Sequence, residues 1–198
     1  MFKTVLVANR GAIACRILRT LKSLNVEGVA VFSDRDRASL HVEQASRAIC
    51  LGDGPGASAY LDVARILEAA KACGAEAIHP GYGFLSENAG FAEACGAAGI
   101  AFLGPTPEQL RAFGLKHTAR ALAQAAGLPM LSGSGLLVSR QHARDEAARV
   151  GYPVMLKSTA GGGGIGMRIC RDAEELADQF DAVKRLGESH FSDDGVFL

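Results

Sequence analysis

In the first half of the chain, short runs of apolar residues alternate with stretches in which apolar residues recur at helical spacing. This pattern predicts an α/β domain with a mainly parallel sheet. Short apolar runs are typical of buried strands, and five of them lie at residues 3–8, 28–32, 47–51, 75–79 and 100–103. Between these runs, apolar residues recur at helical spacing, for example around Ile17, around Ile66 and over residues 88–98. Strands that alternate with helices indicate βαβ units, so we predict a Rossmann-like α/β domain.

The second half of the chain begins with a helix-start signal. Thr106 and Gln109 form a capping-box arrangement in front of a helix that is expected to reach about residue 126. The stretch LSGSG that follows is expected to be a linker or hinge loop. After it we predict a helix at 140–150, strands at 154–158 and 167–170, a capped helix around Phe180 and a strand from residue 195. We therefore expect a first domain at 1–126 and the beginning of a second, α+β, domain at 127–198.

Composition and charge exclude several classes of protein. The chain has 198 residues, of which 48% are apolar and 21% charged, as in ordinary globular proteins. Its 21 Lys+Arg balance 21 Asp+Glu, so no basic surplus favours nucleic acid. The five cysteines form no Cys-x-x-Cys pair, which argues against a disulfide framework or zinc site and favours a cytoplasmic setting. No window approaches the roughly 18 apolar residues of a membrane helix, and the apolar run at 5–8 is too short for a secretory signal.

The stretch MLKSTAGGGGIGMRIC is rich in glycine. Its glycines are Gly161, Gly162, Gly163, Gly164 and Gly166. Each ordered glycine costs roughly 0.5–1 kcal/mol relative to alanine, and a plain hairpin turn needs only two such residues. Lys157 lies just ahead in an apolar strand, where an ammonium group needs an anionic partner. The pattern favours a mobile cover over nucleotide phosphates, with a plain turn as the alternative.

Three further motifs are ambiguous from residue types alone. HPGYGFLSEN follows the strand at 75–79, where α/β sheets bind ligands, but a structural turn fits equally well. Its His79 is typical of a hydrogen-bonded structural histidine. VANRG has only Gly11 of the G-x-G-x-x-G fingerprint, so it favours a tight strand-to-helix turn over a dinucleotide site. Lys116, alone on a helix, is typical of a solvated lysine.

Taken together, four segments resemble the N-terminal portion of biotin carboxylase, the ATP-grasp component of biotin-dependent carboxylases. They are VANRGAIACRILRT, AIHPGYGFLSENAGFAEAC, FLGPTPEQLRAFGLK and GYPVMLKSTAGGGGIGMRIC, and they cover essentially the whole chain. The resemblance implies a pre-ATP-grasp domain followed by the beginning of an ATP-grasp lid. It also implies that ATP phosphorylates bicarbonate and that biotin on a carrier domain captures the released CO2.

The resemblance also implies the site residues. For ATP these are Lys116, Lys157, Gly161, Gly162, Gly163, Gly164, Gly166 and Met167. Tyr82 and Gly83 are implied on the biotin side. The magnesium ligands and the catalytic residues are implied to lie outside this chain. We therefore expect a fragment of a longer enzyme that is inactive by itself.

Two positions indicate a branch of the family. Many biotin carboxylases have Asp and Arg where this chain has Leu115 and Ile165, and the surrounding segments are most similar to the urea carboxylase branch, which includes urea amidolyase and enzymes acting on guanidine. This likeness implies carrier and carboxyltransferase domains on the same full-length chain and a homo-oligomer, while the charge balance and the short apolar runs favour neither nucleic acid nor membrane as partner. Three alternatives stay open: an acyl-CoA or pyruvate carboxylase, another ATP-grasp ligase such as a carbamoyl-phosphate or purine-pathway enzyme, and a non-catalytic nucleotide-binding or oligomerisation module.

Overall fold

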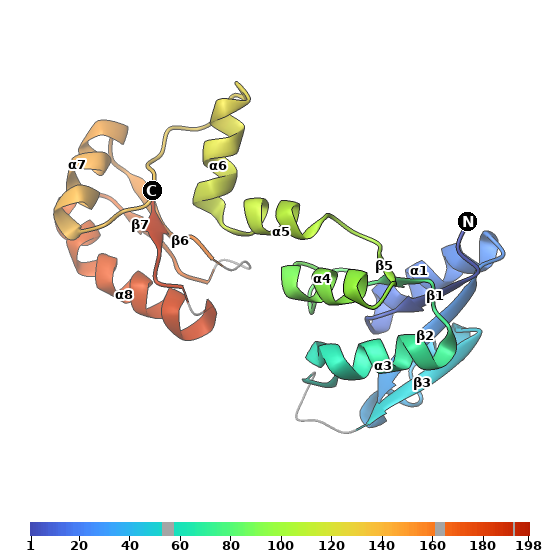
Figure 1. Ribbon diagram of the computed structural model, residues 1–198. Helices are drawn as coiled ribbons and strands as arrows, with labels where there is room; N and C mark the ends of the chain where they lie inside the picture. Colours follow the sequence, from blue (N-terminus) through green and yellow to red (C-terminus); the bar gives the residue numbers. More distant parts are fainter. Residues whose placement is uncertain (53–57, 161–164, 192) are drawn as a thin grey trace. The chain divides into compact units, whose positions relative to one another are not determined.

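The computed structural model describes residues 1–52, 58–160, 165–191 and 193–198 (Figure 1). The chain divides into two units, Met1–Leu110 and Arg111–Leu198. The first unit contains β1 (Thr4–Val7), α1 (Gly11–Ser23), β2 (Glu27–Ser33), η1 (Asp34–Asp36), α2 (Leu40–Gln44), β3 (Arg47–Gly52), η2 (Ser58–Leu61), α3 (Val63–Cys73), β4 (Ala77–His79), α4 (Ala89–Ala97) and β5 (Ala101–Phe102). After these come α5 (Pro107–Gly114), α6 (Lys116–Ala125), α7 (Arg140–Val150), β6 (Val154–Ser158), β7 (Met167–Cys170), α8 (Ala173–Phe191) and β8 (Val196–Phe197).

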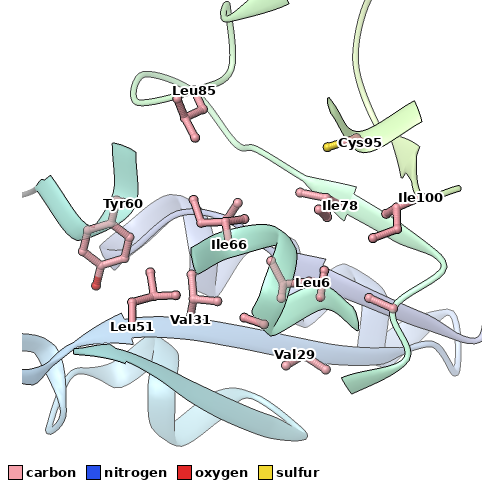
Figure 2. Packing of buried hydrophobic residues seen from close by; sticks show 14 of the residues in the cluster. Leu6, Val29, Val31, Leu51, Tyr60, Ile66, Ile78, Leu85, Cys95 and Ile100 are labelled. Atoms are coloured by element: carbon pink, nitrogen blue, oxygen red, sulfur yellow. The ribbon is translucent and has the colours of Figure 1, made fainter. Parts of the chain in front are cut away.

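The sheet of the first unit is parallel, with strand order β3-β2-β1-β4-β5. Side chains alternate between its faces: Val5 and Val7 pack with α1, whereas Leu6 and Ile78 pack with α3 and α4 (Figure 2). Helices on both faces of a parallel sheet confirm the predicted α/β, Rossmann-like class. The strand order reverses between β1 and β4, and in such sheets ligands bind beyond the carboxyl ends of the strands at that point.

His41 is a titratable side chain inside the first unit. It is fully buried on α2, its Nε2 lies 3.3 Å from the carbonyl oxygen of Val31, and its Nδ1 has no hydrogen-bond partner among the described residues. Burial lowers the pKa of His41. Stability from this group is therefore present above the unfolded pKa of about 6.5 and is lost as the pH falls through the lower folded value.

The titration of His41 predicts an acid-dependent stability. We expect the free energy of unfolding to fall between about pH 7 and 5, and to fall less steeply in His41→Gln, which has no group that titrates there. Urea denaturation at several pH values measures both slopes. Gln44→Ala, which removes no titratable group from α2, is the control and should keep the original slope. Parallel slopes in His41→Gln and the unsubstituted chain would contradict this prediction.

The second unit contains an antiparallel sheet of order β7-β6-β8. Its three strands lie at the positions that the sequence predicts, and their order comes from the structure. One face of this sheet packs against α7 and α8. The buried residues in that cluster are Leu137, Ala143, Ala147, Val154, Leu156, Cys170, Leu176, Phe180, Val183, Val196 and Leu198. This α+β arrangement confirms the predicted class. No helix in the described part of the chain is both long enough and apolar enough to cross a membrane.

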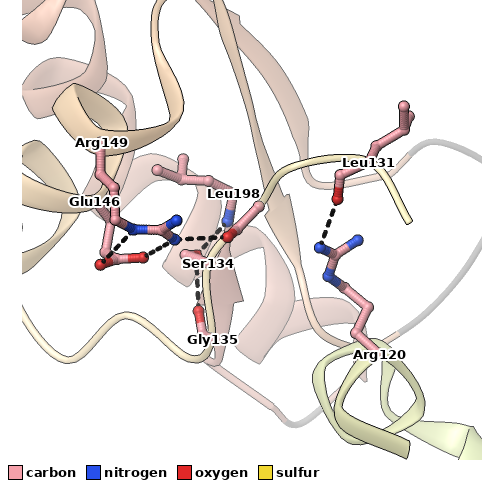
Figure 3. A network of polar contacts seen from close by, with 8 residues as sticks. Arg120, Leu131, Ser134, Gly135, Glu146, Arg149 and Leu198 are labelled. Carbon is pink, nitrogen blue, oxygen red and sulfur yellow. Dashed lines mark hydrogen bonds and ion pairs between the residues drawn. The ribbon is translucent and has the colours of Figure 1, made fainter. Parts of the chain in front are cut away.

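The LSGSG stretch at residues 131–135, predicted as a linker or hinge, is held within the second unit by a network of polar contacts (Figure 3). Ser134 donates its N–H to the carbonyl of Leu198 at 3.0 Å, and the N–H of Leu198 donates to Ser134 Oγ at 2.9 Å. Arg149 pairs with Glu146 and donates to the carbonyl of Gly133 at 2.8 Å. The stretch therefore lies along the last strand, a long-range pairing that its local composition does not indicate.

The helix predicted from Thr106 to about residue 126 is two helices, α5 and α6, with Leu115 between them. The capping box is confirmed, because Thr106 and Gln109 exchange backbone-to-side-chain hydrogen bonds. The two units divide after Leu110, so α6 belongs to the second unit. The domain boundary at residue 126 remains a prediction about organisation in the complete protein.

Gly187 allows α8 to lie close to the strand β6. A Cβ at this position would lie 2.5 Å from the carbonyl oxygen of Asp193 and 2.8 Å from Ser158 Oγ. We expect Gly187→Ala to lower the free energy of unfolding by about 1–3 kcal/mol, because overpacking forces backbone shifts. The control is Gly96→Ala on α4, where an added Cβ would have no other atom within 4 Å. This substitution should raise the free energy of unfolding by roughly 0.5–1 kcal/mol. Equal effects of the two changes in urea denaturation would contradict the packing argument.

Candidate functional site

The loop after β4 has an unusual backbone and an exposed aromatic residue. Gly81, Gly83 and Phe84 have φ values of 68°, 66° and 43°, and positive φ is uncommon for a residue other than glycine. Tyr82, within this loop, is 67% exposed. Tyr82 and Gly83, the predicted biotin-side residues, therefore follow the carboxyl end of β4, beside the point where the strand order reverses.

His79 supports the turn of this loop. Its Nδ1 accepts a hydrogen bond from the N–H of Gly81 at 3.0 Å. Burial lowers the pKa of His79, which favours the neutral imidazole that this contact requires. The geometry fits the interpretation of His79 as a structural histidine.

Asp36 is the shared partner of the polar side chains at the end of β2. Its carboxylate accepts hydrogen bonds from the hydroxyls of Ser33 at 3.1 Å and Tyr60 at 2.7 Å and pairs with Arg10 at 3.2 Å. Burial opposes ionisation of Asp36, yet the two hydroxyls and the Arg10 charge outweigh it and hold the pKa below its ordinary value. In dinucleotide-binding sheets an acidic residue beyond the glycine motif binds the ribose. Here hydrogen-bond donors of the protein itself occupy the carboxylate of Asp36, where a ribose would bind in a dinucleotide site. This agrees with the incomplete fingerprint around Gly11.

In the second unit, Lys157 lies on the central strand of the sheet. It is the cross-strand partner of Met167 on β7 and of Phe197 on β8. Directly opposed residues point to the same face about 5 Å apart, so the cation has an apolar neighbour on each side. Among the described residues, no carboxylate forms an ion pair with Lys157. This arrangement suits an anionic ligand.

Lys116 begins α6, and its backbone is attached to the end of the strand that carries Lys157. The N–H of Lys116 donates to the carbonyl of Thr159 at 3.1 Å. Leu115 is the N-cap residue of α6 and makes no side-chain capping bond. The partial positive charge of a helix N-terminus favours phosphate groups. The two predicted phosphate-binding lysines thus belong to one unit and to adjoining segments.

Thr159 connects the segments around these lysines, although the sequence does not single it out. The side chain is fully buried, and its Oγ1 donates to Asp193 Oδ1 at 2.6 Å. Its N–H donates to the carbonyl of Gly195 at 2.9 Å. Phe197 was missed as well, although the apolar run from residue 195 marks its strand. No local motif indicates the link between Thr159 and Asp193, because the two residues are 34 positions apart.

The glycine run is described only in part. Gly161, Gly162, Gly163 and Gly164 lie outside the described residues. Gly166 has φ 72° and accepts the N–H of Ser158 at 2.9 Å, and a Cβ there would lie 3.0 Å from Ser158 Cβ. Glycine is thus required where the run joins β7. The described residues contain no cluster of three or more His, Cys, Asp or Glu that could hold a metal ion.

Comparison with known families divides the chain much as its two units do. Residues 1–110 match the family described as biotin carboxylase, N-terminal domain. Residues 116–198 match the family described as carbamoyl-phosphate synthase L chain, ATP binding domain. The first match carries the loop around Tyr82, and the second carries Lys116, Lys157 and the glycine run.

Individual proteins resemble the whole chain. The urea amidolyase of Lachancea kluyveri is 51% identical over 197 residues, which are 100% of this chain and 11% of the relative. The biotin carboxylase of Halalkalibacterium halodurans is 50% identical over 199 residues, or 100% of this chain and 44% of the relative. A crystal structure of Campylobacter jejuni biotin carboxylase in complex with an ATP analogue has a TM-score of 0.97 and 38% identity, and it covers 100% of this chain and 44% of that one.

The chain therefore spans between 11% and 44% of the length of these curated relatives. The family match covers residues 1–110, more than half of the 198 residues. This chain belongs to the biotin carboxylase N-terminal domain family.

Proposed function

We propose that this chain is the N-terminal part of a biotin carboxylase of the urea carboxylase type, an ATP-dependent ligase. The observation that carries the proposal is the position of Lys157, a cation between Met167 and Phe197 with no carboxylate partner among the described residues. Transfer of a phosphoryl group to bicarbonate develops negative charge, and fixed cations stabilise that charge where water is excluded.

The proposed roles follow the two parts of the candidate site. Lys157 and Lys116 neutralise phosphate oxygens of ATP, and Met167 borders the adenine. The glycines Gly161, Gly162, Gly163, Gly164 and Gly166 approach the phosphates by their backbone. Tyr82 and Gly83 form the wall against which biotin is bound. Biotin, when bound, supplies the nitrogen that takes up CO2, and the magnesium ions that accompany ATP are assigned to ligands outside the described residues.

We propose urea as the final carboxyl acceptor, with guanidine as the second candidate. The support is the 51% identity to urea amidolyase, although biotin carboxylase of Halalkalibacterium halodurans is 50% identical. The proposal includes a biotin carrier domain and a carboxyltransferase domain on the same full-length chain, assembly as a homo-oligomer, and a cytoplasmic location. The cysteines are free, as expected in a reducing compartment.

Bicarbonate-dependent ADP release by the full-length carboxylase tests the function. We expect ADP release to require bicarbonate, to increase with free biotin, and to increase further with urea but not with acetyl-CoA or pyruvate. Stimulation of ADP release by acetyl-CoA or pyruvate would show that one of these, and not urea, is the carboxyl acceptor. ADP release that is independent of bicarbonate would contradict the proposed reaction.

A further inference from the structure

Asn9 is a buried polar residue that the proposed function does not use. It follows β1 and is 3% exposed. Its amide nitrogen Nδ2 donates to the carbonyl of Pro80 at 2.7 Å and to that of Tyr82 at 2.8 Å. Its Oδ1 accepts the N–H of Arg10 at 2.9 Å. Both ends of the amide are therefore committed, and both donated bonds go to the loop after β4.

This contact fixes the strained part of the loop. A Cβ at Gly81 would lie 2.7 Å from Asn9 Nδ2, so the loop backbone lies directly against the amide. On the far side, Phe84 stacks on Tyr60 with ring centroids 5.2 Å apart. Unusual backbone conformations persist only where the surroundings determine them. Between these two anchors, Tyr82 is left exposed.

We propose that Asn9 is a positioning residue for biotin: its two donated bonds hold Tyr82 and Gly83 in the conformation that meets the biotin ring. The inference rests on the proposed function, since it takes these two loop residues as the biotin wall. Asn9 itself lies beneath the loop and acts through it. Loss of the contact should therefore weaken the use of biotin and leave bicarbonate-dependent ATP cleavage intact, because Lys116 and Lys157 lie on other segments.

Asn9→Asp tests this inference in the full-length carboxylase. The new carboxylate still accepts from Arg10 but faces two carbonyls without a donor. We expect kcat/KM for free biotin to fall at least about tenfold. Bicarbonate-dependent ATP cleavage without free biotin, measured before biotin is attached to the carrier domain, should stay within about twofold of the original. Asn88→Asp is the matched control, because Asn88 lies at the end of the same loop and uses only its oxygen, which accepts the N–H of Phe91 at 2.8 Å. The control should change neither rate.

Gly81→Ala provides a second variant that disturbs the same contact from the loop side, and it should give the same split between the two rates. An unchanged kcat/KM for biotin in both variants would overturn the inference, as would an equal fall of both rates.

Hydrogen exchange separates this inference from the proposed function. The N–H groups of Gly81 and Ser86 donate within the loop, and they should exchange faster in Asn9→Asp but not in Asn88→Asp. Absence of bicarbonate-dependent ATP cleavage in the unsubstituted carboxylase would refute the proposed function. Exchange rates unchanged by Asn9→Asp would refute the inference by themselves.

Discussion

Replacing Lys157 by alanine is expected to lower kcat/KM for ATP in the full-length carboxylase by roughly ten- to hundredfold. The reason is the loss of a charge-assisted contact to phosphate, which contributes about 1.5–3 kcal/mol. The measurement is bicarbonate-dependent ADP release at varied ATP concentration. Lys157→Arg keeps the charge and should retain more activity than alanine.

The control for this experiment is Lys71→Ala, an exposed lysine on α3. It should leave kcat/KM for ATP unchanged, because a solvent-exposed charge contributes little. Thermal unfolding of each variant separates loss of binding from loss of fold. A folded Lys157→Ala enzyme with unchanged kcat/KM for ATP would remove Lys157 from the nucleotide site.

Replacing Asp36 by alanine is expected to destabilise the protein by about 3–5 kcal/mol, because the buried hydroxyls of Ser33 and Tyr60 lose their acceptor and Arg10 its partner. The Arg10 side chain is 45% exposed, so the loss of its ion pair contributes little to this destabilisation. Urea denaturation measures the change. Asp34→Ala provides the control, since Asp34 pairs with Arg37 at the surface and its removal should destabilise the protein far less than removal of Asp36.

The pKa of Asp36 adds a pH dependence to this prediction. Its folded pKa lies below the unfolded value, so its contribution is present above about pH 4 and is lost as the pH falls through the folded pKa. The difference in stability between Asp36→Ala and the unsubstituted chain should therefore shrink in acid. A destabilisation that stays constant down to about pH 2 would show that the carboxylate charge plays no part.

Most of the fold was predictable because its strands are strongly apolar and its helices amphipathic. The short helix α2 was not, since it is five residues long and contains polar residues such as His41 and Gln44. The break between α5 and α6 was missed because apolar residues continue on both sides of Leu115. Local patterns of this kind specify elements more clearly than their ends.

The candidate site was predictable where its residues are close in sequence. Lys157 and Met167 become neighbours through one hairpin, whose register follows from the two strands. The contacts between Asn9 and the loop after β4 join residues more than 70 positions apart. Such pairs depend on the order of strands in the sheet, which places β1 beside β4. No motif around Asn9 indicates its partner.

In the proposed function, this chain is part of an enzyme in which bicarbonate attacks the γ-phosphorus of ATP. The full-length carboxylase, incubated with ATP and bicarbonate labelled with oxygen-18, tests it most directly by mass spectrometry of the released phosphate. Attack by a bicarbonate oxygen leaves that oxygen on phosphorus, so we expect one labelled oxygen in each phosphate formed. Phosphate without the label would show that water is the acceptor and would contradict the proposed reaction.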